Sequence, residues 1–127
     1  YILDDTRRPH IKALAEELGC KYITRPDNKH AKAGNLNNAL PQTNGELITI
    51  MDADFVPFKN FLTRTVGFFQ SPKVDLIQTP QFFYNPDYHA RNMGVDYLLP
   101  NDLEHFFGYV QPGRDTGNTV ICCGTSY

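Results

Sequence analysis

The stretch ITIMDADF, residues 48 to 55, joins an apolar run to two carboxylates one residue apart. The apolar run, taken as residues 46–51, predicts a buried β-strand. Asp52 and Asp54 follow it directly, and in an extended backbone the side chains at i and i+2 project to the same side. Two such carboxylates can share one hard cation, and their oxygens suit Mg²⁺ or Mn²⁺. A strand-end turn with solvated acids is the alternative interpretation.

The composition predicts a single globular domain. The 127 residues are 41% hydrophobic and 20% charged, which is typical of a chain with a packed core. The net charge of −2 and the scattered basic residues argue against a nucleic-acid partner. An odd count of three cysteines without metal-ligand spacing predicts free thiols at Cys20, Cys122 and Cys123. The chain lacks an initiator methionine and opens on a strand-like YIL, so we expect it to be part of a longer protein.

Strands alternate with helices along the sequence, which predicts an α/β fold with a mostly parallel sheet. The expected strands are residues 1–3, 21–24, 46–51, 74–79 and 119–123. The expected helices are residues 8–19, 33–40, 58–69 and part of 94–107. Ligands of such sheets bind at the carboxyl ends of the strands. The pair Asp4 and Asp5 and the pair Asp52 and Asp54 are therefore expected at the same edge.

Two polar stretches at this edge are suited to a nucleotide. In HAKAGNLNNAL, residues 30–40, Lys32 and Gly34 lie at a predicted helix start, which favours an anion such as phosphate. A plain helix start with a surface lysine is the alternative. In LDDT, Asp4 or Asp5 could accept hydrogen bonds from a base or a ribose, or one of them could cap the following helix.

Two later stretches are suited to a sugar, and each has a structural alternative. TPQFFYNPD (79–87) carries three aromatics that form either a sugar platform or a buried turn, and CCGTSY (122–127) forms either a pocket floor or a strand and turn. DADFV, residues 52–56, also fits the nucleophile loop of haloacid-dehalogenase-like phosphatases. That interpretation requires a later acidic pair, whereas no DD follows Asp54.

Taken in order, LDD, HAKAGNLNNAL, MDADFVP, QTPQFFYNPD and CCGTSY resemble the family 2 glycosyltransferases of the bacterial cellulose synthase type. The resemblance runs from residue 1 to residue 127. It implies a GT-A fold, a nucleotide-binding α/β sheet with flanking helices. It also implies a parent protein in the plasma (inner) membrane, with this domain facing the cytoplasm and with accessory synthase subunits as possible partners.

The resemblance also assigns roles to residues. It implies that Asp4 and Asp5 bind the uridine part of the donor and that Lys32 binds its diphosphate. It implies that Asp52 and Asp54 hold Mg²⁺ or Mn²⁺ against that diphosphate, Asp52 being also a donor-binding residue. The residues that it places at the entry of the acceptor glucan are Phe83, Tyr84, Cys123, Gly124 and Thr125.

The implied reaction transfers a glucosyl unit from UDP-glucose to a growing β-glucan with inversion. Thr6, Phe55 and Gln81 depart from the residues common in the family. The TED motif, which supplies the general base, and the QxxRW motif are absent from residues 1–127, and so is the first strand of the fold. We therefore expect a partial catalytic domain whose base lies beyond residue 127. The alternative is a non-catalytic sugar-nucleotide-binding module.

Overall fold

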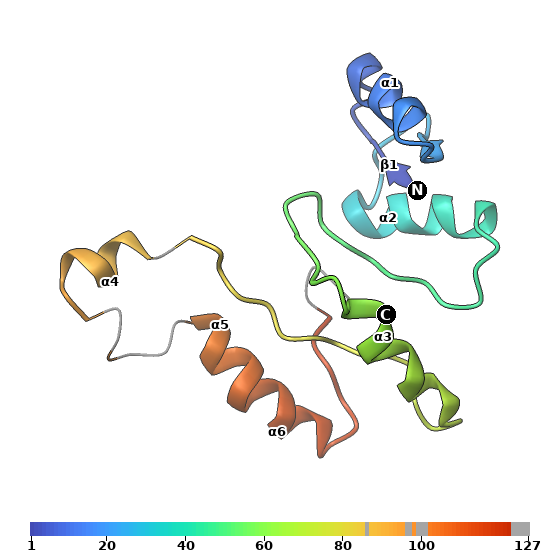
Figure 1. Ribbon diagram of the computed structural model, residues 1–127. Coiled ribbons are helices and arrows are strands. Elements are labelled where there is room, and N and C mark those ends of the chain that lie inside the picture. Colours follow the sequence, from blue (N-terminus) through green and yellow to red (C-terminus); the bar gives the residue numbers. More distant parts are fainter. Residues whose placement is uncertain (86, 96–97, 99–101, 123–127) are drawn as a thin grey trace. The chain divides into compact units, whose positions relative to one another are not determined.

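The computed structural model describes residues 1–85, 87–95, 98 and 102–122, and the chain divides into two compact units (Figure 1). The N-terminal unit is Tyr1–Glu46 and the C-terminal unit is Leu47–Tyr127.

The N-terminal unit is built on a parallel pair of short strands joined by a helix. Strand β1 (Ile2–Leu3) leads into α1 (Pro9–Glu17), which returns the chain to β2 (Tyr22–Ile23). The unit ends with α2 (Ala31–Ala39) and the 3₁₀ turn η1 (Leu40–Gln42). Helix α1 packs against β2, and α2 packs against β1. The buried apolar residues of this small core are Ala15, Ile23 and Ala39.

Helix α1 has local signals at both of its ends. Pro9 occupies the first turn, where its missing N–H leaves no hydrogen bond unmade. At the other end Gly19 adopts φ 66°, and the N–H of Cys20 donates to the carbonyl of Ala15 at 2.8 Å. This is a Schellman motif, whose left-handed residue is favourable for glycine. The chain is thereby turned from α1 into β2.

The C-terminal unit is helical over much of its described part. Its helices are α3 (Phe61–Thr65), η2 (Val66–Gln70), α4 (Tyr88–Asn92), α5 (Asp102–His105), the π-helical η3 (Phe106–Val110) and α6 (Gln111–Asp115). The last three follow one another without a break and form one helical segment (Figure 1). The carboxylate of Asp87 caps α4, because it accepts the N–H of His89 at 2.8 Å.

The fold prediction is confirmed in part. The structure is a partial α/β domain with a parallel strand pair, and the helices predicted at 8–19, 33–40 and 58–69 are present as α1, α2 and α3 with η2. Within residues 94–107, helix begins at Asp102.

The later predicted strands are wrong in the described part of the chain. Residues 46–51 contain only the isolated bridge residue Ile50, and residues 74–79 contain no strand or bridge residue. Leu47 and Ile48 are each 40% exposed, so this apolar run lacks the burial that a central strand requires. Residues 119–122 form no strand, because the Gln111 amide donates to the carbonyl of Ile121 and accepts its N–H. Residue 123 lies outside the described residues.

In the described residues no helix is both long and apolar enough to cross a bilayer.

Candidate nucleotide-binding edge and carboxylate turn

The carboxyl ends of β1 and β2 bring three charged residues to one edge of the N-terminal unit. Asp4 and Asp5 follow β1, and Arg25 follows β2 after one intervening residue. The strands are parallel, so both chains leave the sheet at the same end.

Asp4 is buried and fully engaged with its own chain. It is 2% exposed, and its carboxylate accepts the N–H of Arg8 at 2.8 Å, the N–H of Thr6 at 3.1 Å and the hydroxyl of Tyr22 at 2.9 Å. The Arg8 guanidinium also pairs with it at 3.1 Å. Burial alone would raise the pKa of Asp4, but these hydrogen bonds outweigh it and hold the pKa well below its ordinary value. The Arg8 N–H lies directly before α1, so Asp4 supports the start of that helix.

Asp5 pairs with Arg25 through two parallel hydrogen bonds. The Nε and Nη2 atoms of Arg25 donate to the two carboxylate oxygens of Asp5 at 2.7 Å and 2.6 Å. These bonds lower the pKa of Asp5 and raise that of Arg25. The side chain of Asp5 keeps 23% of its surface exposed, whereas that of Arg25 keeps 5%. Asp5, unlike Asp4, therefore retains side-chain surface that a ligand could reach.

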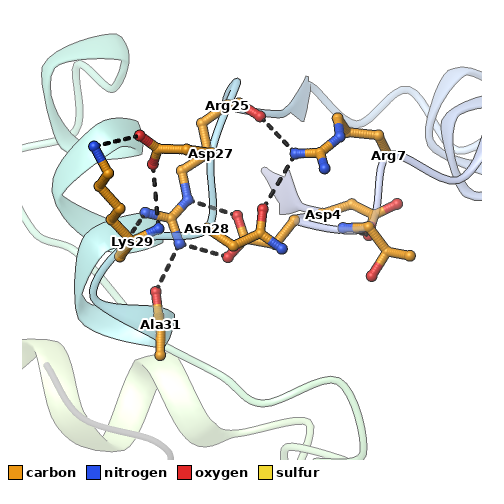
Figure 2. A network of polar contacts seen from close by, with 9 residues as sticks. Asp4, Arg7, Arg25, Asp27, Asn28, Lys29 and Ala31 are labelled. Carbon is orange, nitrogen blue, oxygen red and sulfur yellow. Dashed lines mark hydrogen bonds and ion pairs between the residues drawn. The ribbon is translucent and has the colours of Figure 1, made fainter.

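Arg25 also holds the loop that leads into α2 (Figure 2). Its Nη1 donates to the carbonyl of Lys29 at 2.6 Å, and its Nη2 donates to the carbonyl of Ala31 at 2.9 Å. Ala31 is the first residue of α2 and Lys32 the second, and Lys32 is exposed. The predicted phosphate-binding lysine is thus one residue from a carbonyl that Arg25 fixes.

A hollow of about 390 Å³ lies beside this loop. Its lining residues are Arg25, Pro26, Asp27, Lys29, His30, Gly34, Asn37 and Asn38. Among the residues that the structure describes, the buried Nδ2 of Asn38 has no hydrogen-bond partner, and neither has the buried Oδ1 of Asn35, which does not line the hollow. The hollow therefore offers mixed polar groups next to the first turn of α2.

Asp52 and Asp54 lie in the C-terminal unit on a tight turn. The N–H of Phe55 donates to the carbonyl of Asp52 at 3.1 Å, with Ala53 and Asp54 as the central residues. The expectation of an extended backbone at these positions is therefore wrong, because the chain turns between the two carboxylates. Asp54 is exposed and Asp52 is half-buried.

The donor set of this turn suits a hard divalent cation, because Mg²⁺ is often held by one or two carboxylates together with water and phosphate. In the described part of the chain no group of three or more His, Cys, Asp or Glu side chains could hold a metal ion. Two carboxylates would thus be the contribution of this turn, and the remaining positions would belong to water and ligand oxygens.

The predicted acceptor residues are described only in part. Phe83 is 65% exposed and Tyr84 is 100% exposed, so both rings are available to a ligand in the C-terminal unit. The alternative of a buried aromatic turn is wrong for these two residues. Cys123, Gly124 and Thr125 lie outside the described residues.

Arg25 is the residue that the sequence interpretation missed. Its partner Asp5 is 20 positions away, beyond any local pattern. The available signal was its position directly after the predicted strand 21–24, at the edge where Asp4 and Asp5 were expected. The sequence also predicts that Asp4 or Asp5 and Lys32 lie in one cleft with Asp52. This stays a prediction, because Asp52 belongs to the other unit.

Comparison with known proteins supports the resemblance. The family model for glycosyl transferase family 2 matches residues 1–126. Cellulose synthase 1 of Komagataeibacter xylinus is 47% identical over 126 residues, which are 98% of this chain and 8% of that protein. The cellulose synthase catalytic subunit (UDP-forming) of Pseudomonas fluorescens (strain SBW25) is 44% identical over 98% of this chain and 17% of its own length.

A third relative has the same name. The cellulose synthase catalytic subunit (UDP-forming) of Xanthomonas axonopodis pv. citri (strain 306) is 40% identical, again over 98% of this chain and 17% of that protein. The chain thus spans 8% to 17% of the length of these curated relatives. Because the family model covers nearly all of the sequence, the chain belongs to glycosyl transferase family 2.

Proposed function

We propose that this protein transfers a glucosyl unit from UDP-glucose to a growing β-glucan, with inversion and with Mg²⁺ or Mn²⁺. The observation that carries the proposal is the bonded edge of the N-terminal unit. There Arg25 joins Asp5 to the start of α2, one residue before Lys32. The names of the relatives, cellulose synthases described as UDP-forming, support this donor and acceptor.

The setting that we propose follows from the family. A GT-A fold would extend the parallel pair β1–β2 into a larger, mostly parallel sheet. The whole protein would lie in the plasma (inner) membrane with this domain facing the cytoplasm, and accessory synthase subunits would be its partners. The general base for the acceptor hydroxyl would lie outside residues 1–127.

In the proposed donor site the two N-terminal acids have different tasks. Asp4 has 2% of its surface exposed, so it supports the strand end and the start of α1. Asp5 accepts one bond from Arg25 at each oxygen and retains lone pairs that can accept from a base N–H or a ribose hydroxyl. Lys32 supplies a cationic amine in the first turn of α2, where the helix dipole also favours a diphosphate.

Asp52 and Asp54 would hold the divalent ion. When bound, such an ion stabilises as a Lewis acid the negative charge that develops on a leaving diphosphate. Both acids lie on one turn, and only Ala53 separates them along the chain. The exposed rings of Phe83 and Tyr84 offer apolar faces on which a glucose ring of the acceptor can stack.

Release of UDP from UDP-glucose, measured with a cello-oligosaccharide acceptor, tests the proposal on the full-length protein. We expect turnover that requires Mg²⁺ or Mn²⁺ and that Asp52→Asn abolishes without changing the thermal unfolding curve. Arg64→Lys, an exposed change on α3, is the matched control and should leave turnover unchanged. UDP binding without turnover in the full-length protein would favour the non-catalytic binding module instead. The family match already favours a transferase over the phosphatase interpretation.

A further inference from the structure

Arg25 uses four of its five N–H donors in hydrogen bonds within the N-terminal unit. Of its five N–H donors, Nε and one on Nη2 bind Asp5, another on Nη2 binds the carbonyl of Ala31, and one on Nη1 binds the carbonyl of Lys29. Its side chain is 5% exposed. A buried guanidinium with four such bonds joins the end of β1 to the start of α2.

The loop that Arg25 holds has an unfavourable backbone. His30 has φ 60° and Ala31 has φ 45°, two consecutive non-glycine residues in the left-handed region. Such residues cost about 1–3 kcal/mol each and persist only where their surroundings fix them. Two of those fixing contacts are the bonds from Arg25 to Lys29 and Ala31.

Gly34 shows how closely the arrangement is packed. It lies in the second turn of α2, where its N–H donates to the carbonyl of His30 at 3.0 Å. A Cβ at Gly34 would collide with the carbonyl oxygen of Lys29 and with Nη1 of Arg25. The guanidinium, the Lys29 carbonyl and α2 therefore meet at a point that has no room for a side chain.

We propose that Arg25 is a positioning residue of the donor site, which holds Asp5 and the Lys32-bearing first turn of α2 in one fixed arrangement. The inference rests on the proposed function, in which Asp5 and Lys32 contact the nucleotide. Only a guanidinium provides the planar fork for a carboxylate and, at the same time, donors for two carbonyls. A lysine at position 25 would keep the charge but lose this geometry.

A merely structural Arg25 makes a different prediction. Loss of such a residue would lower the Tm and the amount of active protein, so that kcat per protein falls while KM for UDP-glucose stays unchanged. A positioning residue acts on donor binding. Its loss should raise KM for UDP-glucose by roughly 10- to 100-fold, by analogy with the loss of partners that orient metal-ligating side chains.

Two variants of the full-length protein alter the contact between Arg25 and α2, one at the arginine and one on the helix. Arg25→Lys removes the fork, and Gly34→Ala pushes α2 away from it. Their matched controls are Arg64→Lys on α3 and Gly113→Ala in α6, where an added Cβ meets nothing within 4 Å. We would measure KM and kcat for UDP-glucose, and hydrogen–deuterium exchange of the peptides that cover residues 26–34.

The expected result is a raised KM, a kcat within about twofold of wild type and faster exchange over residues 26–34 in both variants, with both controls unchanged. Unchanged exchange or an unchanged KM in a folded Arg25→Lys protein overturns the inference. Gly34→Ala decides in the same way if Arg25→Lys does not fold. If the wild type neither binds UDP nor turns over UDP-glucose, the proposed function fails, and the exchange data alone still decide whether Arg25 fixes the loop.

Discussion

Gly34→Ala should destabilise the protein, although alanine is the better helix former. Within a helix, alanine is favoured over glycine by about 1 kcal/mol. At Gly34 the added methyl collides with the carbonyl oxygen of Lys29, a backbone atom that Arg25 holds in place. Overpacking of this kind typically costs about 1–3 kcal/mol, and a fixed backbone atom places this site at the upper end. We expect a net loss of about 2 kcal/mol in the free energy of unfolding.

Gly113→Ala is the matched control, because the same change in α6 meets open space. It should stabilise the protein by about 0.5–1 kcal/mol, so the two variants should shift in opposite directions. The assay is urea unfolding followed by far-ultraviolet circular dichroism, since the chain has no tryptophan for fluorescence. A Gly34→Ala protein as stable as the wild type would refute the reasoning, because it would mean that the Lys29 carbonyl moves freely.

Three further predictions concern the acids and the ligand. Asp4 and Asp5 have lowered pKa values in the folded state, so the stability that they contribute is present above the ordinary pKa of 3.8 and is lost as pH falls below it. Urea unfolding should show a smaller free energy of unfolding at pH 3 than at pH 6. Asp4→Asn should make this difference between the two pH values smaller. Tyr22→Phe removes a donor to Asp4 and should move the acid-unfolding midpoint to higher pH, whereas an unchanged midpoint would mean that the 2.9 Å contact is unimportant. The isolated 127-residue chain should bind UDP in calorimetry with Mg²⁺, bind it more weakly with EDTA and release no UDP from UDP-glucose; turnover would place the general base within residues 1–127.

The sequence predicted the elements that have local signals. Pro9 and Gly19 mark both ends of α1, and each acts through backbone geometry that one residue determines. The strands expected at 46–51 and 74–79 had only an apolar composition in their favour. A strand requires a neighbour to pair with, and composition alone does not specify that neighbour. The segment 119–122 had a competing partner, the amide of Gln111, that no periodicity reveals.

The candidate site was predictable in its residue types but not in its connections. Asp4, Asp5 and Lys32 were found from strand ends and a helix start, whereas Arg25 was not, because its pairing with Asp5 depends on the parallel register. The sequence also could not distinguish the tasks of the two adjacent acids. That distinction depends on the hydrogen-bond partners that each one finds at the strand end.

The register places Asp4 on the same face as Tyr22. Ile2 pairs with Tyr22 across the two strands, and residues two apart along a strand project to the same face. Asp4 is two residues after Ile2, and its N–H continues the ladder by donating to β2 at 3.0 Å. The Tyr22 hydroxyl therefore reaches the Asp4 carboxylate, and the charge of this acid is used within the fold.

Asp5 and Arg25 both come shortly after the paired ends of the two strands. Leu3 pairs with Ile23, and Asp5 and Arg25 come two residues after Leu3 and Ile23 respectively. Asp5 is a central residue of the turn after β1, in which the N–H of Arg7 donates to the carbonyl of Asp4, and from this turn its carboxylate accepts two bonds of 2.7 Å and 2.6 Å from Arg25. Since Arg25 also bonds to the start of α2, it is the second acid of the pair, and not the first, that is coupled to the lysine-bearing turn.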